Sequence, residues 1–146
     1  MAEGVQSRRR VEPALIVAAT LSWIPPLLLV LVRTIWTGAP TRIPVHWAGD
    51  SPDQWGSATA FFWTMLVPGL GGSLICSLLV FPLSTDVSRR AAAAVMGGLS
   101  AGTGAIASVW IAALLTAAHV SAPFLVVLVA VAWGALVAAV SLVRRE

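Results

Sequence analysis

Four long apolar stretches dominate this sequence and limit what it can fold into. They cover residues 13–36, 58–81, 91–118 and 122–143. A helix needs about 20 apolar residues to cross about 30 Å of hydrocarbon, and each stretch is long enough. We therefore expect an all-α membrane protein, with four transmembrane helices packed in a bundle that forms a single domain over residues 13–143.

The composition supports the same class of protein. Hydrophobic residues make up 58% of the chain and charged residues only 10%, with a mean hydropathy of +0.90. A soluble domain carries about 25% charged residues. The net charge of +3 comes from arginines that flank the apolar stretches, so it indicates membrane topology and gives no reason to expect nucleic-acid binding.

The arginines predict the orientation of the chain. Seven of them fall on one side of the four stretches and two on the other. The seven are Arg8, Arg9, Arg10, Arg89, Arg90, Arg144 and Arg145, and the two are Arg33 and Arg42. Arginine collects on the cytoplasmic side, so residues 1–12 and 144–146 are expected to be cytoplasmic tails. Residues 37–57 then form an ordered extracytoplasmic loop.

The first apolar stretch follows three arginines, as the core of a signal peptide does. It is longer than such a core, so we expect it to be retained as a transmembrane helix. Pro25 and Pro26 fall near its middle and predict a kink, with the hydroxyls of Thr20 and Ser22 placed to satisfy the freed carbonyls.

Small residues recur every fourth position in the other three stretches. The series are Gly69, Ser73 and Ser77; Ala94, Gly98 and Gly102; and Ala130, Gly134 and Ala138. Such stripes let membrane helices approach closely, so a leucine at Gly98 should disturb the bundle. One stripe could instead join two copies of the chain. Trp23, Trp110 and Trp133 lie deep in the stretches, where they either pack in the bundle or line a cavity.

Residues 41–57 form the one long polar segment within this apolar chain. Pro40, Pro44 and Pro52 exclude a continuous helix, so we expect an extended connection with fixed turns. Ser57 stands where it can cap the helix that follows.

The same segment carries a family resemblance. The run Ile-Pro-Val-His-Trp at 43–47, followed by Pro-Asp-Gln-Trp-Gly-Ser at 52–57, resembles the signature of a bacterial membrane-domain family of unknown function. That family includes the SdpI-type immunity proteins. Ala48 stands where the family commonly has Asn, and the spacer before Pro52 is one residue short. The resemblance covers about residues 36–62.

The resemblance implies a multi-pass protein of the bacterial cytoplasmic membrane. It would bind or sense an extracellular factor, or give immunity to a secreted peptide toxin. The residues expected to bind the ligand or to shape the loop are Arg42, Pro44, His46, Trp47, Asp53, Trp55 and Gly56. We expect His46 and Asp53 to support the loop, and Trp47 and Trp55 to pin it to the membrane interface.

Two other classes of function stay open. The chain could be an accessory subunit that binds another membrane protein, in a transporter or an enzyme complex. It could also be a metal-dependent membrane enzyme, because His46, Asp50, Asp53 and His119 all map to the outer face. Their spacing matches no known ligand motif, and no nucleophile accompanies a base, so we expect neither catalysis nor a cofactor. The apolar stretches also lack the central charges that ion-coupled carriers use.

Overall fold

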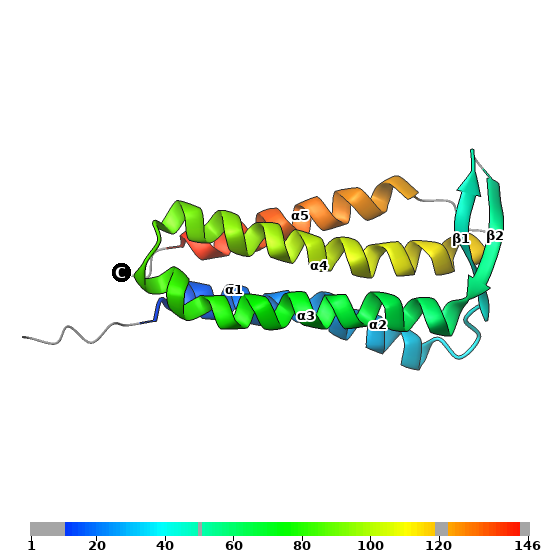
Figure 1. Ribbon diagram of the computed structural model, residues 1–146, viewed down its shortest axis with the longest axis horizontal. Coiled ribbons are helices and arrows are strands. Elements are labelled where there is room, and N and C mark those ends of the chain that lie inside the picture. Colours follow the sequence, from blue (N-terminus) through cyan, green and yellow to red (C-terminus); the bar gives the residue numbers. More distant parts are fainter. Residues whose placement is uncertain (1–10, 50, 119–122, 144–146) are drawn as a thin grey trace, which may run out of the picture.

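The computed structural model describes residues 11–49, 51–118 and 123–143. In the last helix, the side chains are described only from residue 127 onward. The helices run along one long axis, and a β-hairpin closes one end (Figure 1). The elements are α1 (Pro13–Ser22), α2 (Ile24–Ile35), β1 (Arg42–Ala48), β2 (Ser51–Ser57), α3 (Ala58–Thr85), α4 (Arg89–Ala117) and α5 (Pro123–Leu142). The helical bundle is confirmed. The all-α class is wrong at the connection between the first two spans, which forms two strands.

The helices are long and apolar enough to make this an integral membrane protein. Three spans meet the length and hydropathy that crossing a bilayer requires: Pro13–Ile35, Ala58–Thr85 and Arg89–Ala117. The fourth expected span corresponds to α5, which is apolar over Val127–Leu142. The second span ends four residues later than expected and the third begins two residues earlier. Ser88 explains the early start, because its hydroxyl accepts a hydrogen bond from the Ala91 N–H at 3.3 Å.

The kink predicted at Pro25 and Pro26 is present as a break between α1 and α2 at Trp23. The hydroxyls of Thr20 and Ser22 do not repair it, since each donates to a carbonyl in its own helix. Side chains of α3 stabilise the break instead. The Ser73 hydroxyl donates to the Ser22 carbonyl oxygen at 2.7 Å, and the Trp23 indole donates to Ser77 Oγ at 3.0 Å. The break is therefore held by hydrogen bonds between helices, which are valuable where no water competes.

Glycine allows α4 and α5 to pack closely. A Cβ added at Gly97 would lie 2.7 Å from the Ala138 Cβ and 2.9 Å from the Gly134 carbonyl oxygen. A Cβ at Gly134 would lie 2.8 Å from the Gly97 carbonyl oxygen. The stripe on α5 is therefore at the contact, as expected. The stripe expected on α4 is wrong by one residue, because Cβ atoms added at Gly98 and Gly102 would meet no atom within 4 Å.

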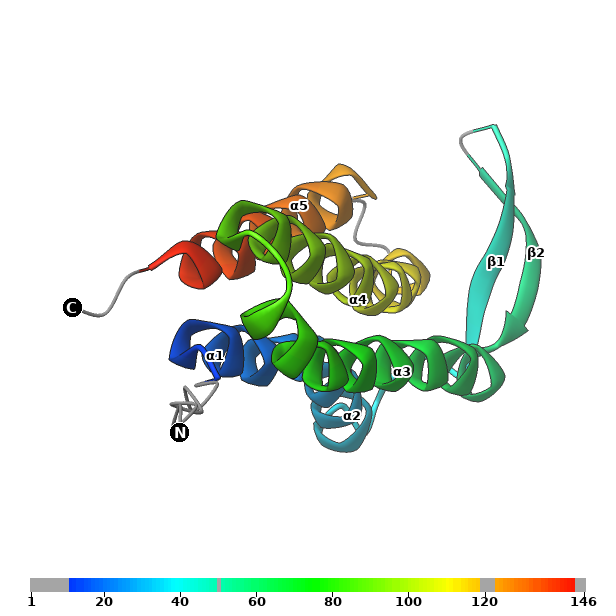
Figure 2. The ribbon, with the colours of Figure 1, turned by 60° about the vertical axis from the view of Figure 1, so that its left-hand side comes forward.

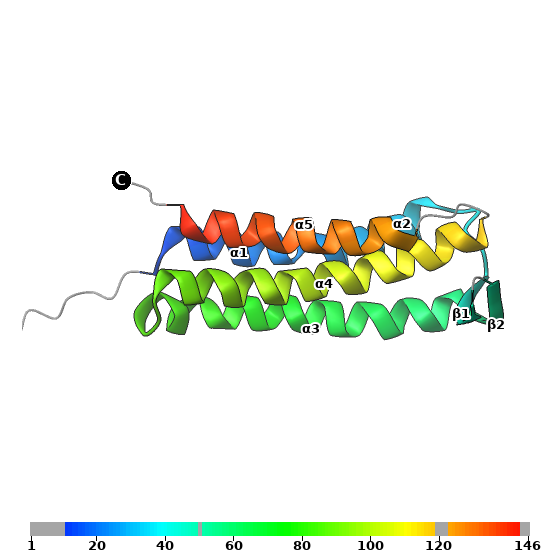
Figure 3. The same ribbon diagram turned by 90° about the horizontal axis from the view of Figure 1, so that it is seen from above.

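An ion pair and a hydrogen bond fasten the end of the bundle that lies opposite the hairpin. The start of α1, the α3–α4 connection and the end of α5 lie at one end, and the hairpin lies at the other (Figure 3). Arg89 forms an ion pair with Glu12, and the Glu12 backbone N–H donates to Ser84 Oγ at 3.1 Å. These contacts fasten the residue before α1 to the end of α3 and to the start of α4.

The adjacent glycines of α4 provide a matched test of this packing. Gly97→Ala places a methyl group against the α5 backbone and should lower the free energy of unfolding by about 1–3 kcal/mol. Gly98→Ala adds the same methyl group in open space and should cost nothing, or stabilise the helix by up to about 1 kcal/mol. Thermal unfolding in detergent measures both. Equal destabilisation by the two variants would contradict the assigned contact.

Candidate recognition hairpin

Strands β1 and β2 form a two-stranded antiparallel sheet whose turn projects away from the helices (Figure 2). Arg42 pairs with Ser57 at the base and Ala48 with Ser51 near the tip. Gly49 adopts a φ of 66° at the turn, a conformation that favours glycine. The register shifts on both sides of His46. Prolines are tolerated in such edge strands and bulges, which is why a segment that they exclude from helix still forms a sheet.

The base of the hairpin is built into the helical core. Ile43 and Pro44 are fully buried, and Ile43 packs in one cluster with Phe62, Trp110 and Leu114. A two-stranded hairpin is at best marginally stable alone in water. Burying Ile43 therefore supplies the stabilisation that the strands lack.

Hydrogen bonds join the hairpin to the start of α3. The Ala58 N–H donates to the Thr41 carbonyl oxygen at 3.0 Å. The Ser57 side chain accepts from the Ala60 N–H at 3.3 Å, which is the predicted cap. Strand β2 ends at Ser57 and helix α3 begins at the next residue, Ala58, so movement of β2 is coupled directly to α3.

His46 and Asp53 face each other across the strands. His46 donates through Nδ1 to Asp53 Oδ1 at 2.7 Å. The two side chains are 60% and 40% exposed, and an exposed pair of this kind contributes about 0–1 kcal/mol. The pair therefore adds one weak contact between the strands, while the main anchor of the hairpin is Ile43.

The other candidate residues take distinct places in the hairpin. The Arg42 guanidinium donates to the Trp55 carbonyl oxygen at 3.2 Å. Trp47 and Trp55 are 44% and 43% exposed, so both indoles are available to a membrane interface or a ligand. A Cβ added at Gly56 would lie 2.9 Å from Val45 Cγ1, so glycine leaves room for that valine.

A metal centre gains no support from the described part of the chain. Within residues 11–49, 51–118 and 123–143, no three His, Cys, Asp or Glu side chains come close enough to hold a metal ion. Asp50 and His119, which the metal hypothesis also used, lie outside the described residues. Cys76 is a buried free thiol in the core of the bundle.

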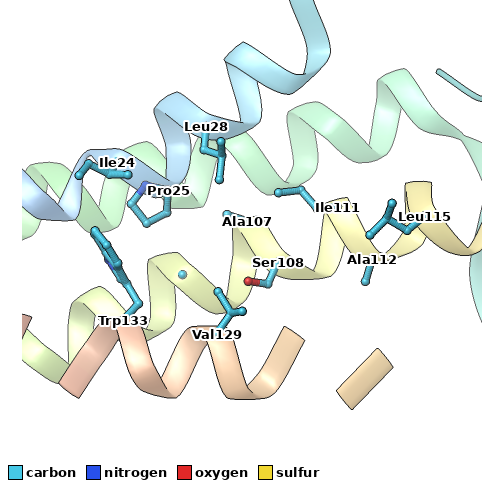
Figure 4. Close-up of a pocket in the computed structure, with 11 residues that line it drawn as sticks. Ile24, Pro25, Leu28, Ala107, Ser108, Ile111, Ala112, Leu115, Val129 and Trp133 are labelled. Carbon is cyan, nitrogen blue, oxygen red and sulfur yellow. The ribbon is translucent and has the colours of Figure 1, made fainter. Parts of the chain in front are cut away.

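The helices line a partly open cavity of about 300 Å³ that sequence reasoning did not locate (Figure 4). Pro25 and Leu28 from α2, Ser108 and Ile111 from α4, and Trp133 from α5 line it. Trp133 is thus one of the deep tryptophans that line a cavity. The signal in the sequence was the Pro25–Pro26 pair, because a broken helix cannot pack continuously against its neighbours.

A second, smaller cavity of about 50 Å³ lies at the base of the hairpin. Its lining includes Arg33, Thr41, Thr59 and Trp110. Three of these side chains are polar, and Trp110 lies far from all three in the sequence, so no local motif could have indicated the cavity.

Comparisons with protein-family models, with curated proteins and with solved structures found no match to this chain.

The anchoring role of Ile43 can be tested within one strand. Ile43→Ala should lower stability by about 2–5 kcal/mol, because it removes a fully buried side chain. Val45→Ala trims a side chain that is 41% exposed and should cost less. Hydrogen exchange of the amides of residues 42–57 in detergent should accelerate strongly in the first variant and little in the second. Equal acceleration would show that the hairpin does not depend on this anchor.

Proposed function

We propose that this chain is a multi-pass protein of the bacterial cytoplasmic membrane whose outward-facing hairpin binds an extracellular factor. The specific function proposed is immunity to a secreted peptide toxin, or sensing of such a peptide. The resemblance of residues 36–62 to the SdpI-type family supports this function. The arginine distribution supports cytoplasmic termini and an outward hairpin.

One observation carries the proposal: the resembling segment is an ordered hairpin fixed at its base and exposed above it. Ile43 is buried in the core, whereas His46, Trp47 and Trp55 are exposed. A surface that is ordered before binding loses less conformational entropy when it takes a ligand. Exposed indoles supply large contact areas at low entropic cost.

The connections of the hairpin provide a route for a response. Ligand contact with β2 would act on α3 through the Ser57 cap and the Ala58 hydrogen bond. Helix α3 in turn holds the break between α1 and α2 through Ser73 and Ser77. Helix α3 therefore connects the hairpin with the break in the middle of the bundle.

A second candidate function is that of an accessory subunit of a membrane complex. Gly98 and Gly102 favour it, because they leave one side of α4 open to the backbone of another helix. In the native host, crosslinking from this side of α4 to a different membrane protein would support this function over immunity.

The proposed function predicts a specific loss in two hairpin variants. His46→Ala and Asp53→Ala should abolish protection or signalling, because each removes an exposed polar group from the hairpin and breaks the same hydrogen bond. The genes would be returned to a deletion strain, which is then challenged with secreted peptides of related strains. Val87→Ala, an exposed change in the α3–α4 connection, is the control and should retain full protection.

Protein levels in the membrane should be the same for all three variants. Added zinc or a chelator should change neither protection nor signalling. Full activity in a His46→Ala, Asp53→Ala double variant would rule out the hairpin as the recognition surface. Strong sensitivity to a chelator would favour the metal-dependent alternative.

A further inference from the structure

We propose that the apolar cavity beside Pro25 is a binding site for one acyl chain of a membrane phospholipid. The cavity has a volume of about 300 Å³, is partly open, and lies between α2, α4 and α5. Figure 1 shows α2 and α5 diverging toward the hairpin end, beyond the break at Trp23. The site belongs to the helices alone, so it does not rest on the function proposed for the hairpin.

The floor of the cavity is one face of α4. Its residues recur at spacings of three and four, as on a single helix face. They are Gly104, Ala107, Ser108, Ile111, Ala112 and Leu115. Most of them are small, which leaves the volume between the helices unfilled. Figure 4 shows the lining running from Trp133 past Ser108 to Leu115, so the cavity is elongated along the helix.

The length and depth of this face match one leaflet of a bilayer. From residue 104 to residue 115 an α-helix rises about 16 Å. The hydrocarbon core is about 30 Å thick, so one leaflet contributes about 15 Å. Helix α4 extends from Arg89 to Ala117, and the cavity follows its second half toward the hairpin end. An acyl chain of the leaflet on the hairpin side therefore lies at the depth of the cavity.

The wall of the cavity accepts hydrocarbon and excludes ordered water. Trp133 Nε1 is shielded from the cavity, so its indole presents only carbon atoms there. Among the described side chains that line the cavity, Ser108 has the one hydroxyl. A buried water needs about 2–4 polar partners, which one hydroxyl cannot supply. The ligand that fits this wall is an apolar chain.

The rim of the cavity gives such a chain a way in from the bilayer. Ile24 and Leu28 on α2 and Val129 on α5 line the cavity and are exposed. Helix α2 belongs to the candidate span Pro13–Ile35, so this apolar rim faces lipid. A chain can therefore enter sideways without leaving hydrocarbon.

The volume of the cavity fits part of one chain. A cavity of about 150 Å³ holds a benzene ring with six carbon atoms, so about 300 Å³ has room for about 12 carbon atoms. The headgroup and the second chain of the phospholipid would stay in the bilayer. An empty cavity forfeits the van der Waals contacts of its lining, so the bound chain should stabilise the bundle.

Native mass spectrometry of protein purified from its membrane in a mild, uncharged detergent tests this site. The wild type should retain one phospholipid per chain. Ala112→Phe places a ring in the cavity from its floor and should lose the lipid. Val109→Phe places the same ring on the exposed side of α4 and should keep it. A wild type without lipid, equal retention by the two variants, or a bound lipid of another class would overturn the proposal.

Thermal unfolding separates lipid binding from folding. Delipidated wild type and Val109→Phe should unfold at a lower temperature than the lipid-bound forms. Lysophospholipids of increasing chain length should restore the unfolding temperature, with the gain levelling off at about 12 carbon atoms. Ala112→Phe should gain nothing, because its ring occupies the cavity. Ser108→Leu fills less of the cavity and should level off at shorter chains.

The chain-length series also distinguishes the site from general stabilisation by amphiphiles. An equal gain in the wild type and Ala112→Phe would overturn the site. If Ala112→Phe does not fold, Ser108→Leu decides in its place, and a plateau at the wild-type chain length would overturn the site. A gain that rises with chain length without levelling off would do the same. None of these outcomes depends on the protection assay.

Discussion

Burial of Ile43 is the interaction on which the architecture of the hairpin end depends. It joins a polar two-stranded sheet, too small to be stable alone, to the apolar cluster of Phe62 and Trp110. The same cluster brings Trp110 to the wall of the small cavity beside Arg33. One buried side chain thus orders the exposed surface and packs in the same cluster as Trp110, which lines the cavity beneath it.

The rest of the bundle is held by contacts suited to a lipid environment. Lipid removes most of the hydrophobic drive for helices to associate, so close backbone packing and hydrogen bonds between helices become important. Gly97 and Gly134 supply the first between α4 and α5. Ser73 and Ser77 supply the second, at the break between α1 and α2. The break is consequently a stable feature that also leaves the apolar cavity beside Pro25.

Sequence reasoning predicted the features that depend on local chemistry. Hydropathy indicated the long helices, the Pro25–Pro26 pair predicted the break, and the Ser57 cap followed from its position before an apolar run. Sequence reasoning failed where a contact depends on which helix lies beside a residue in the fold. A four-residue spacing fits Gly98 as well as Gly97, and only the position of α5 distinguishes them. The cavity at Trp110 likewise requires four segments that meet only in the fold. The ligand-binding role of the hairpin stays a prediction.

The central claim is that the anchored hairpin faces the outside of the cell, and thiol accessibility tests it most directly. Single cysteines would replace Gln54 in β2 and the exposed Val87 in the α3–α4 connection, in a Cys76→Ala background that removes the native thiol. An impermeant maleimide applied to intact cells should label the cysteine at position 54, and should label that at position 87 only after the membrane is permeabilised. Labelling of position 87 but not of position 54 in intact cells would contradict the account.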